Sequence, residues 1–493
     1  MNDAKPENTS GDWLVEATIE DLQDKMAEGE VTSGELVQMY FHRIARFDGK
    51  LRSVLELNPD ALHIASALDA ERKRKGPRGP LHGIPILLKD NIDTGDKMHT
   101  SAGSYALAGH LAEEDAFIVS RLRRAGAVLL GKTNMTEWAN FMTVNMPSGY
   151  SSRGGQTLNP YGPGKFDVGG SSSGAGAAAA ANFAAAAVGT ETSGSILNPC
   201  LKNSLVGIKP TVGLLSRRGI IPIAHSQDTP GPMAKTVKDA AYLLSIMSGT
   251  DENDPATGAI PSTLPKDYAG ILSDTDLTGI RIGIAGEPYT LRLSKHKLAL
   301  MDEAKNVLRE LGAELVEPIE IPSARNTWTF DIFTYEFKVN LNVYLQQTSP
   351  TNRVRSLAEV IRYNEEDPER MLKYGQVLLK LSESTSGTLT EPDYLNKLEE
   401  DFRLARNEGI DYAIKKHQLD AIFFGGDRGS VISARAGYPT VIVPAGYIPN
   451  GEPFGVSFTG TAFSEEKLLQ IAYAFEQATH HRKPPKLILN DEE

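Results

Sequence analysis

Two short stretches rich in serine and glycine offer the clearest chemistry in the sequence. Residues 169–174 are Gly-Gly-Ser-Ser-Ser-Gly, and residues 189–195 are Gly-Thr-Glu-Thr-Ser-Gly-Ser. Consecutive backbone amides in a tight turn that contains glycine can point at one oxygen atom, as an oxyanion hole requires. A serine at the end of such a turn is well placed to attack the same carbonyl group. The pattern therefore indicates a serine nucleophile acting on a carbonyl compound.

A serine nucleophile needs a base, and the sequence offers two kinds. The triple serine satisfies the pattern Gly-x-Ser-x-Gly, which would make Ser172 the nucleophile, with Asp228 and His417 downstream. The alternative is a lysine kept neutral, which replaces histidine in some serine hydrolases. Lys89 and Lys132 each follow a short apolar run, where burial disfavours the ammonium form. Residue types and spacing leave both alternatives open.

Other common kinds of site lack their residues. The ten histidines include no His-Glu-x-x-His pattern, and Cys200 is the only cysteine, so a zinc site has no compact ligand set. A phosphate-binding loop needs a lysine after its glycines, and residues 169–174 have none. Two Ser-x-x-Lys matches, at residues 294–297 and 464–467, lack the further elements of a β-lactamase. We therefore expect no metal and no cofactor.

Strands and helices in alternation must position these side chains. Apolar runs at residues 84–88 and 127–130 predict buried strands, with a helix at 115–124 between them. This order favours parallel pairing in an α/β fold. Residues 175–188, almost all alanine, predict a buried central helix that is too short to span a membrane.

The second half of the chain changes in character. From about residue 265 to 418 the sequence is charged and helix-rich, with the clearest helices at 298–311 and 393–414. Apolar runs at 421–424 and 440–443 then predict further strands. The middle part is thus interpreted as a helical elaboration between two portions of one sheet.

The charge balance argues against several classes of partner. The 493 residues include 51 Lys and Arg against 63 Asp and Glu, a net charge of −12. Such a surface repels nucleic-acid phosphates and anionic lipid, so no nucleic-acid or membrane partner is expected. One cysteine permits no internal disulfide, and residues 1–15 lack the apolar region of a secretory signal. A cytoplasmic location is therefore expected.

A series of motifs, in this order along the chain, resembles the amidase signature family and within it the peptide amidases. The matching pieces are Leu81-His82-Gly83-Ile84-Pro85, Lys89-Asp90-Asn91, Gly131-Lys132-Thr133-Asn134, Gln156-Thr157-Leu158-Asn159-Pro160, residues 169–174, residues 189–195, Gly207-Ile208-Lys209-Pro210-Thr211, residues 228–234 and Ala436-Gly437-Tyr438-Pro439. Ser195 stands 24 residues after Ser171, which is the spacing of the family's two catalytic serines. The ordered combination is specific, whereas a single piece would not be.

The resemblance implies a role for each residue of the site. Ser195 corresponds to the nucleophile, Lys89 to the base, and Ser171 to the bridging serine, whose preceding peptide bond is cis in the family. Lys132 matches a structural lysine. The backbone amides that match the oxyanion hole are those of Thr192, Ser193, Gly194 and Ser195.

The resemblance also implies a fold and an activity. We expect an α/β/α sandwich, a large mixed sheet flanked by helices, as one domain over residues 1–490 with the helix-rich elaboration at 265–418. The implied reaction is hydrolysis of carboxamides through an acyl-enzyme, releasing ammonia or an amine. The substrate would be a small amide or the C-terminal amide of a short peptide, and the protein a monomer or homodimer. Two alternatives stay open: the amidase subunit of a tRNA-dependent amidotransferase, and a catalytically inactive module that binds a carboxylate.

Two departures from the family pattern bear on the site. Ser193 stands where most of the family has glycine or aspartate, a change that leaves backbone donors in place. The segment 423–436 is shorter than usual and lacks the typical Pro-Thr. Because that segment helps to wall the substrate pocket in relatives, its shortness could open the pocket to bulkier amides, anilides, esters or carbamates.

Overall fold

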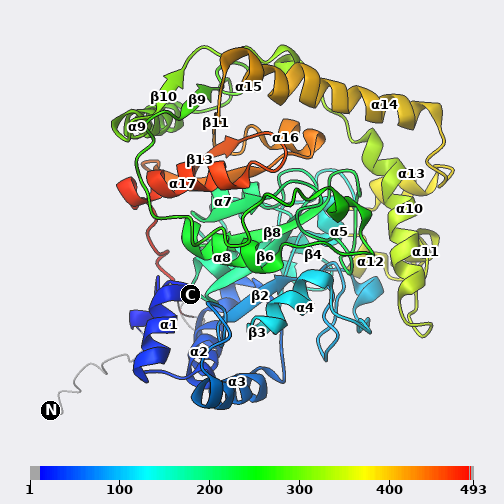
Figure 1. Cartoon of the computed structure of the whole chain (residues 1–493). Coiled ribbons are helices and arrows are strands. Elements are labelled where there is room, and N and C mark those ends of the chain that lie inside the picture. Colours follow the sequence, from blue (N-terminus) through cyan, green and yellow to red (C-terminus); the bar gives the residue numbers. More distant parts are fainter. Residues whose placement is uncertain (1–11, 488, 490–493) are drawn as a thin grey trace.

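The computed structural model describes residues 12–487 and residue 489, and its centre is one mixed β-sheet (Figure 1). Residues 1–11, which include most of the segment predicted to lack a secretory signal, lie outside the described residues. In order across the sheet, its strands within the described chain are β1 (Val54–Leu57), β3 (Val128–Thr133), β2 (Pro85–Lys89), β6 (Ala186–Glu191), β8 (Thr229–Ala234), β7 (Val206–Lys209), β12 (Thr440–Tyr447), β13 (Pro453–Thr459), β11 (Ala421–Gly425), β9 (Arg281–Ile284) and β10 (Glu314–Val316). A separate hairpin pairs β4 (Tyr150–Ser151) with β5 (Gly155–Gln156).

Parallel pairing occurs in two groups of strands within this sheet. One group is β3, β2 and β6, and the other is β11, β9 and β10. The remaining neighbours pair antiparallel. The predicted strands at 84–88 and 127–130 are thus confirmed as β2 and β3, which pair in parallel as expected.

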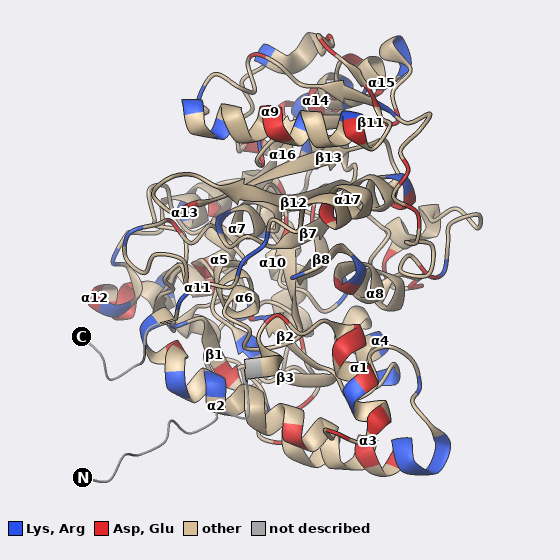
Figure 2. Ribbon diagram, turned by 90° about the vertical axis from the view of Figure 1, so that its left-hand side faces the viewer, with Lys and Arg blue, Asp and Glu red and all other residues tan. Residues whose placement is uncertain are grey.

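Helices cover both faces of the sheet, which confirms the layered α/β architecture. Helices α8 and α17 pack on one face and α6 and α7 on the other, while charged residues concentrate on the outer helices (Figure 2). The helices are α1 (Ile19–Glu28), α2 (Ser33–Leu51), α3 (Ala61–Lys75), α4 (Phe117–Arg124), α5 (Glu137–Asn140), α6 (Ser173–Ala180), α7 (Leu197–Lys202), α8 (Val237–Met247), α9 (Lys295–Glu310), α10 (Asp331–Gln347), α11 (Leu357–Glu366), α12 (Pro368–Met371), α13 (Val377–Glu383), α14 (Pro392–Phe402), α15 (Asp411–His417), α16 (Ser430–Ala436) and α17 (Glu465–Thr479).

The alanine-rich segment differs from its prediction. The expected helix over 175–188 is correct only for α6, which ends at Ala180. The chain then turns at Asn182, whose φ of 60° lies in the left-handed region, and residues from Ala186 onward form the buried strand β6. Alanine favours a helix locally, but a run of alanines has no pattern of apolar and polar residues that distinguishes a helix from a strand. Packing between neighbouring strands in the interior of the sheet therefore determines that the second half is a strand.

The helix-rich part at 265–418 contains the predicted helices and two strands as well. The helix expected at 298–311 is α9, and the one expected at 393–414 is a nearly continuous run of α14, a π-helical stretch (Arg403–Ile410) and α15. Strands β9 and β10 extend the sheet to its edge, so this part adds to the sheet as well as covering it. Helices α10, α11 and α13 lie along one side of the molecule, and α14 and α15 cross its top (Figure 1).

Glycine is required at the start of α6 because two other backbone segments approach it. A Cβ atom added to Gly174 would lie 2.4 Å from the carbonyl oxygens of both Asn134 and Ser53. We expect Gly174→Ala to lower the free energy of unfolding by about 3 kcal/mol or more, since both neighbours are backbone. Gly258→Ala is the control, because nothing lies within 4 Å of its added Cβ. Urea unfolding midpoints measure the effect, and equal midpoints for the two variants would contradict it.

Candidate active site

Lys89 ends β2, an interior strand of the sheet, and is completely buried. Its Nζ donates hydrogen bonds to Ser171 Oγ (2.7 Å), Thr190 Oγ1 (2.8 Å) and the Thr190 carbonyl oxygen (3.2 Å). Burial lowers the pKa of the lysine to about 7, although the negative charges of Glu191 and Asp228 act in the opposite direction. A large share of this amine is therefore neutral near pH 7 and able to accept a proton.

Ser171 precedes α6 and follows a cis peptide bond from Gly170, as the resemblance implied. Besides accepting the Lys89 hydrogen bond through its side chain, it accepts one through its carbonyl oxygen from the Thr136 amide (3.0 Å). The next amide, that of Ser172, donates to the carbonyl oxygen of Ser195 (3.2 Å). This backbone contact holds the two serine-bearing stretches side by side.

Ser195 lies in the turn between β6 and α7, directly after Gly194, whose φ is 81°. Only 8% of the residue is exposed. Within the described chain its hydroxyl makes no hydrogen bond, and none joins it to Ser171. The structure thus brings Lys89 and Ser171 into direct contact and places Ser195 on the adjacent turn.

A buried carboxylate, Glu191, organises that turn from behind. The side chain lies at the end of β6 and is 1% exposed. Its Oε1 accepts the Gly194 amide (2.7 Å), and its Oε2 accepts the amides of Ile196 (2.7 Å) and Leu197 (3.0 Å). Three charge-assisted hydrogen bonds satisfy the buried carboxylate and fix the path of the chain on both sides of Ser195.

The expected set of oxyanion donors therefore changes. The amides of Thr192, Ser193 and Ser195 make no hydrogen bonds within the described residues and stay available. The Gly194 amide was expected to be a fourth oxyanion donor, but in the structure it donates to Glu191. Backbone spacing could not reveal this, since the competing acceptor is a side chain of the turn itself.

The histidine alternative is wrong. The Ser172 hydroxyl is buried and bonded to Thr190, donating to its carbonyl oxygen (3.0 Å) and accepting from its amide (3.2 Å). His417 ends α15, where its Nε2 accepts the amide of Glu320 (3.0 Å). Within the described residues no histidine is hydrogen-bonded to the Ser172 hydroxyl.

Lys132 also lies in a buried strand, β3, but it faces other partners. Its Nζ donates to the Ile92 carbonyl oxygen (2.7 Å) and to Thr100 Oγ1 (2.8 Å). Burial lowers the pKa of this amine too. Its hydrogen bonds therefore join β3 to the loop after β2, and none of them goes to a serine of the described chain.

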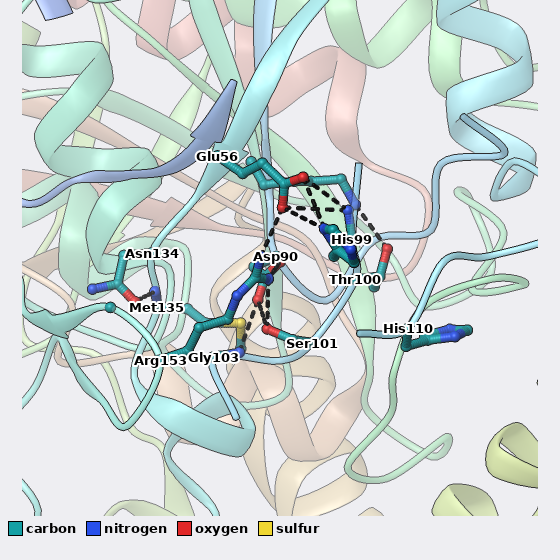
Figure 3. A network of polar contacts seen from close by, with 12 residues as sticks. Glu56, Asp90, His99, Thr100, Ser101, Gly103, His110, Asn134, Met135 and Arg153 are labelled. Carbon is teal, nitrogen blue, oxygen red and sulfur yellow. Dashed lines mark hydrogen bonds and ion pairs between the residues drawn. The ribbon is translucent and has the colours of Figure 1, made fainter. Parts of the chain in front are cut away.

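Asp90, the residue after Lys89, anchors the surrounding loops (Figure 3). Its Oδ2 accepts the Ser101 hydroxyl and the Gly103 amide (2.9 Å), and its Oδ1 lies 3.4 Å from an Nη of Arg153. Arg153 in turn pairs with Glu56 (2.7 Å) on β1. This network ties the end of β2 to the loop that follows it and to the edge of the sheet.

Three residues of the site had no predicted role: Asp90, Thr190 and Glu191. Each adjoins a predicted site residue or sits at the end of a buried strand. That position is the signal that could have identified them, because a polar side chain buried there must find hydrogen-bond partners.

A narrow cavity opens beside Thr192 and Thr190, and Thr190 is the residue that accepts hydrogen bonds from Lys89. Its walls are Asn91, Ala139, Thr190, Thr192, Arg217, residues 220–223, His225 and residues 228–230. On the other side of the turn, the Ser430 hydroxyl at the start of α16 would lie 3.5 Å from a Cβ on Gly194. The segment at 423–436 thus contributes α16 to the surroundings of the turn.

Two other kinds of site are absent from the described residues. No group of three or more His, Cys, Asp or Glu side chains there could hold a metal ion. No helix of the described chain is long and apolar enough to cross a membrane.

A mixed sheet whose neighbouring strands β2 and β6 bring a buried amine beside two serine-bearing turns is typical of an α/β enzyme that acts on carbonyl groups. The family description Amidase matches residues 35–469. The chain belongs to this family and is an amide-hydrolysing enzyme, which confirms the resemblance drawn from the motifs.

Individual relatives cover nearly the whole chain. A probable amidase of Arabidopsis thaliana is 44% identical over 96% of this chain and 92% of its own. The solved structure of the native peptide amidase from Stenotrophomonas maltophilia is 45% identical, with a TM-score of 0.89 over 96% of this chain and 99% of that one. One subunit of the glutamyl-tRNA(Gln) amidotransferase of Methylobacillus flagellatus is 31% identical over 96% of this chain and 99% of its own.

Proposed function

We propose that this amidase acts through an acyl-enzyme on Ser195, with Lys89 as the base and Ser171 as the proton relay. The observation that carries the proposal is the buried Lys89 amine, 2.7 Å from the Ser171 hydroxyl and with its pKa brought to about 7. A general base works best when its pKa lies near the pH at which the enzyme operates.

The proposed steps follow from these positions. Neutral Lys89 accepts the Ser171 proton while Ser171 accepts that of Ser195, and the Ser195 oxygen bonds to the amide carbon. The carbonyl electrons move to oxygen, where the free amides of the turn stabilise the charge. Collapse breaks the carbon–nitrogen bond, and the proton returns through Ser171 to the leaving nitrogen. Water then attacks the acyl group by the same route.

The Ser171→Ala variant tests the relay. We expect kcat/KM for an amide to fall by about 10³-fold, because the proton path between Lys89 and Ser195 is cut. Ser173→Ala is the matched control, since its hydroxyl makes only a long contact (3.3 Å) with Thr136 and should leave the rate within a few-fold of wild type. Full activity in Ser171→Ala would rule out the relay.

We further propose that the substrates are C-terminal amides of short peptides. The 45% identical peptide amidase supports this class. The physical reason is that ammonia is a small leaving group that needs one proton, whereas cleavage of an internal bond requires chain to pass the nucleophile on both sides.

A panel of five compounds tests the substrate class. The compounds are a peptide amide, the same peptide as its free acid, a simple aliphatic amide, an anilide and an ethyl ester, with ammonia and product masses as the readout. We expect ammonia from the peptide amide and an untouched peptide acid. Internal cleavage of the acid would contradict the specificity, and turnover of the anilide would show that the site admits leaving groups bulkier than ammonia.

The amidotransferase subunit stays the second candidate, because a subunit of that kind is 31% identical over most of the chain. It would require partner subunits, so co-purification of a second chain without free amidase activity would favour it. We propose a single domain over residues 1–490, a monomer or homodimer, and the cytoplasmic location that the sequence favours.

A further inference from the structure

Asp228, which the histidine alternative had used as an acid, contacts the candidate oxyanion turn directly. It precedes β8 and lies on the wall of the cavity. Its Oδ1 accepts the hydroxyl of Thr192 (2.5 Å), and its Oδ2 accepts the amides of Ile223 and Ala224 (2.9 Å each). One carboxylate therefore joins the turn to the loop that forms the opposite wall.

We propose that Asp228 is a positioning residue for amide hydrolysis, which holds the Thr192 end of the oxyanion turn against the loop at residues 223–224. The inference rests on the proposed function and adds a residue to it. Asp228 does not touch the reacting atoms; it acts through Thr192.

The turn has two carboxylate anchors, and they hold different ends. Glu191 takes the amides of Gly194, Ile196 and Leu197, on the α7 side of the turn. Asp228 holds the side chain of Thr192, on the β6 side. Between the two anchors lie amides that are free to receive an oxyanion. Loss of the second anchor would leave their direction unconstrained at Thr192, and oxyanion donors must be aligned before the reaction to be effective.

Asp228 also contributes charge at the base. Its carboxylate and that of Glu191 are the two negative charges that raise the pKa of Lys89 against burial. Asp228 itself is faced by Arg217 and by Glu336 of α10, with His225 on the same cavity wall, and burial raises its pKa to about 7. Removing this charge should lower the pKa of Lys89 further, so the rise of kcat/KM with pH should begin at lower pH.

Three variants separate geometry from charge. Thr192→Val removes the hydroxyl and leaves the charge, Thr192→Ser keeps the hydroxyl, and Asp228→Asn removes the charge. The asparagine oxygen can still accept the two loop amides, while its NH₂ donates to the Thr192 hydroxyl. We expect Thr192→Val to lower kcat about 10- to 100-fold with a smaller change in KM, and Thr192→Ser to behave as wild type. Asp228→Asn should move the rise of kcat/KM with pH to lower pH, because it removes one of the two negative charges that raise the pKa of Lys89.

The measurements are kcat and KM on the peptide amide from pH 5 to 10, with thermal unfolding and labelling by a fluorophosphonate probe on every variant. A wild-type kcat in Thr192→Val would overturn the inference. So would an Asp228→Asn variant whose kcat/KM rises over the same pH range as that of the wild type. A folded wild-type chain that neither turns over the amide nor takes up the probe would overturn the proposed function itself, and this inference with it.

Discussion

Replacing Ser195 by alanine is expected to reduce amide turnover by roughly 10⁶-fold, to the level that binding and the oxyanion donors sustain alone. The reason is that no acyl-enzyme can form without the attacking oxygen. The fold should be unaffected, because the hydroxyl makes no hydrogen bond within the described chain. Steady-state ammonia release measures the loss, and the thermal unfolding midpoint checks the fold.

Ser193→Ala is the matched control for Ser195→Ala. It removes a hydroxyl from the same turn and keeps the backbone amide that we propose as an oxyanion donor, so activity should stay within a few-fold of wild type. If Ser195→Ala retained a rate near that of Ser193→Ala, the nucleophile would have to lie elsewhere.

Replacing Lys89 by methionine is expected to lower the maximal kcat/KM by about 10⁴-fold, since general-base catalysis accounts for a factor of up to that size. Methionine keeps a similar shape in the fully buried site. The wild-type enzyme should show kcat/KM rising with pH, with a midpoint near the Lys89 pKa of about 7, because only the neutral amine accepts a proton. One pH unit below that midpoint, the rate should be about a tenth of its plateau.

The variant should lose that limb along with the activity. A pH series of kcat/KM from 5 to 10 on wild type and Lys89→Met compares the two profiles. A wild-type rate independent of pH over that range, or an unchanged limb in Lys89→Met, would remove Lys89 as the base.

Much of the site could be predicted from the sequence because local patterns encode it. Apolar runs place Lys89 and Lys132 at the ends of buried strands, and the structure confirms both positions. The choice between them depends on the order of strands, which no local pattern contains. Strand β2 is the neighbour of β6, and so only Lys89 reaches Thr190 and the start of α6; β3 lies one strand further away.

The parts that could not be predicted depend on tertiary contacts. Residues 175–188 are almost all alanine, yet their first part is in helix α6 and their last part is in strand β6. The two parts have the same composition and differ in the elements that they pack against. The Gly194 amide was expected to face the oxyanion, but a glutamate three residues earlier reaches it first. Whether the glutamate reaches this amide depends on the backbone conformation of the turn. Glycine permits several conformations, so its presence in the sequence does not specify one.

The buried, neutral Lys89 lowers the stability of the folded chain. Lys89 titrates near pH 7 when folded, whereas its ordinary pKa is 10.5. Between those values the unfolded chain binds a proton that the folded chain does not, so stability falls as pH decreases from 10.5 towards 7 and the penalty is constant below that. At neutral pH it amounts to roughly 5 kcal/mol, comparable with the whole stability of many domains. The same Lys89→Met chain that has lost its activity should therefore unfold at a higher temperature than the active enzyme, which is the trade-off between activity and stability that a neutral buried amine imposes.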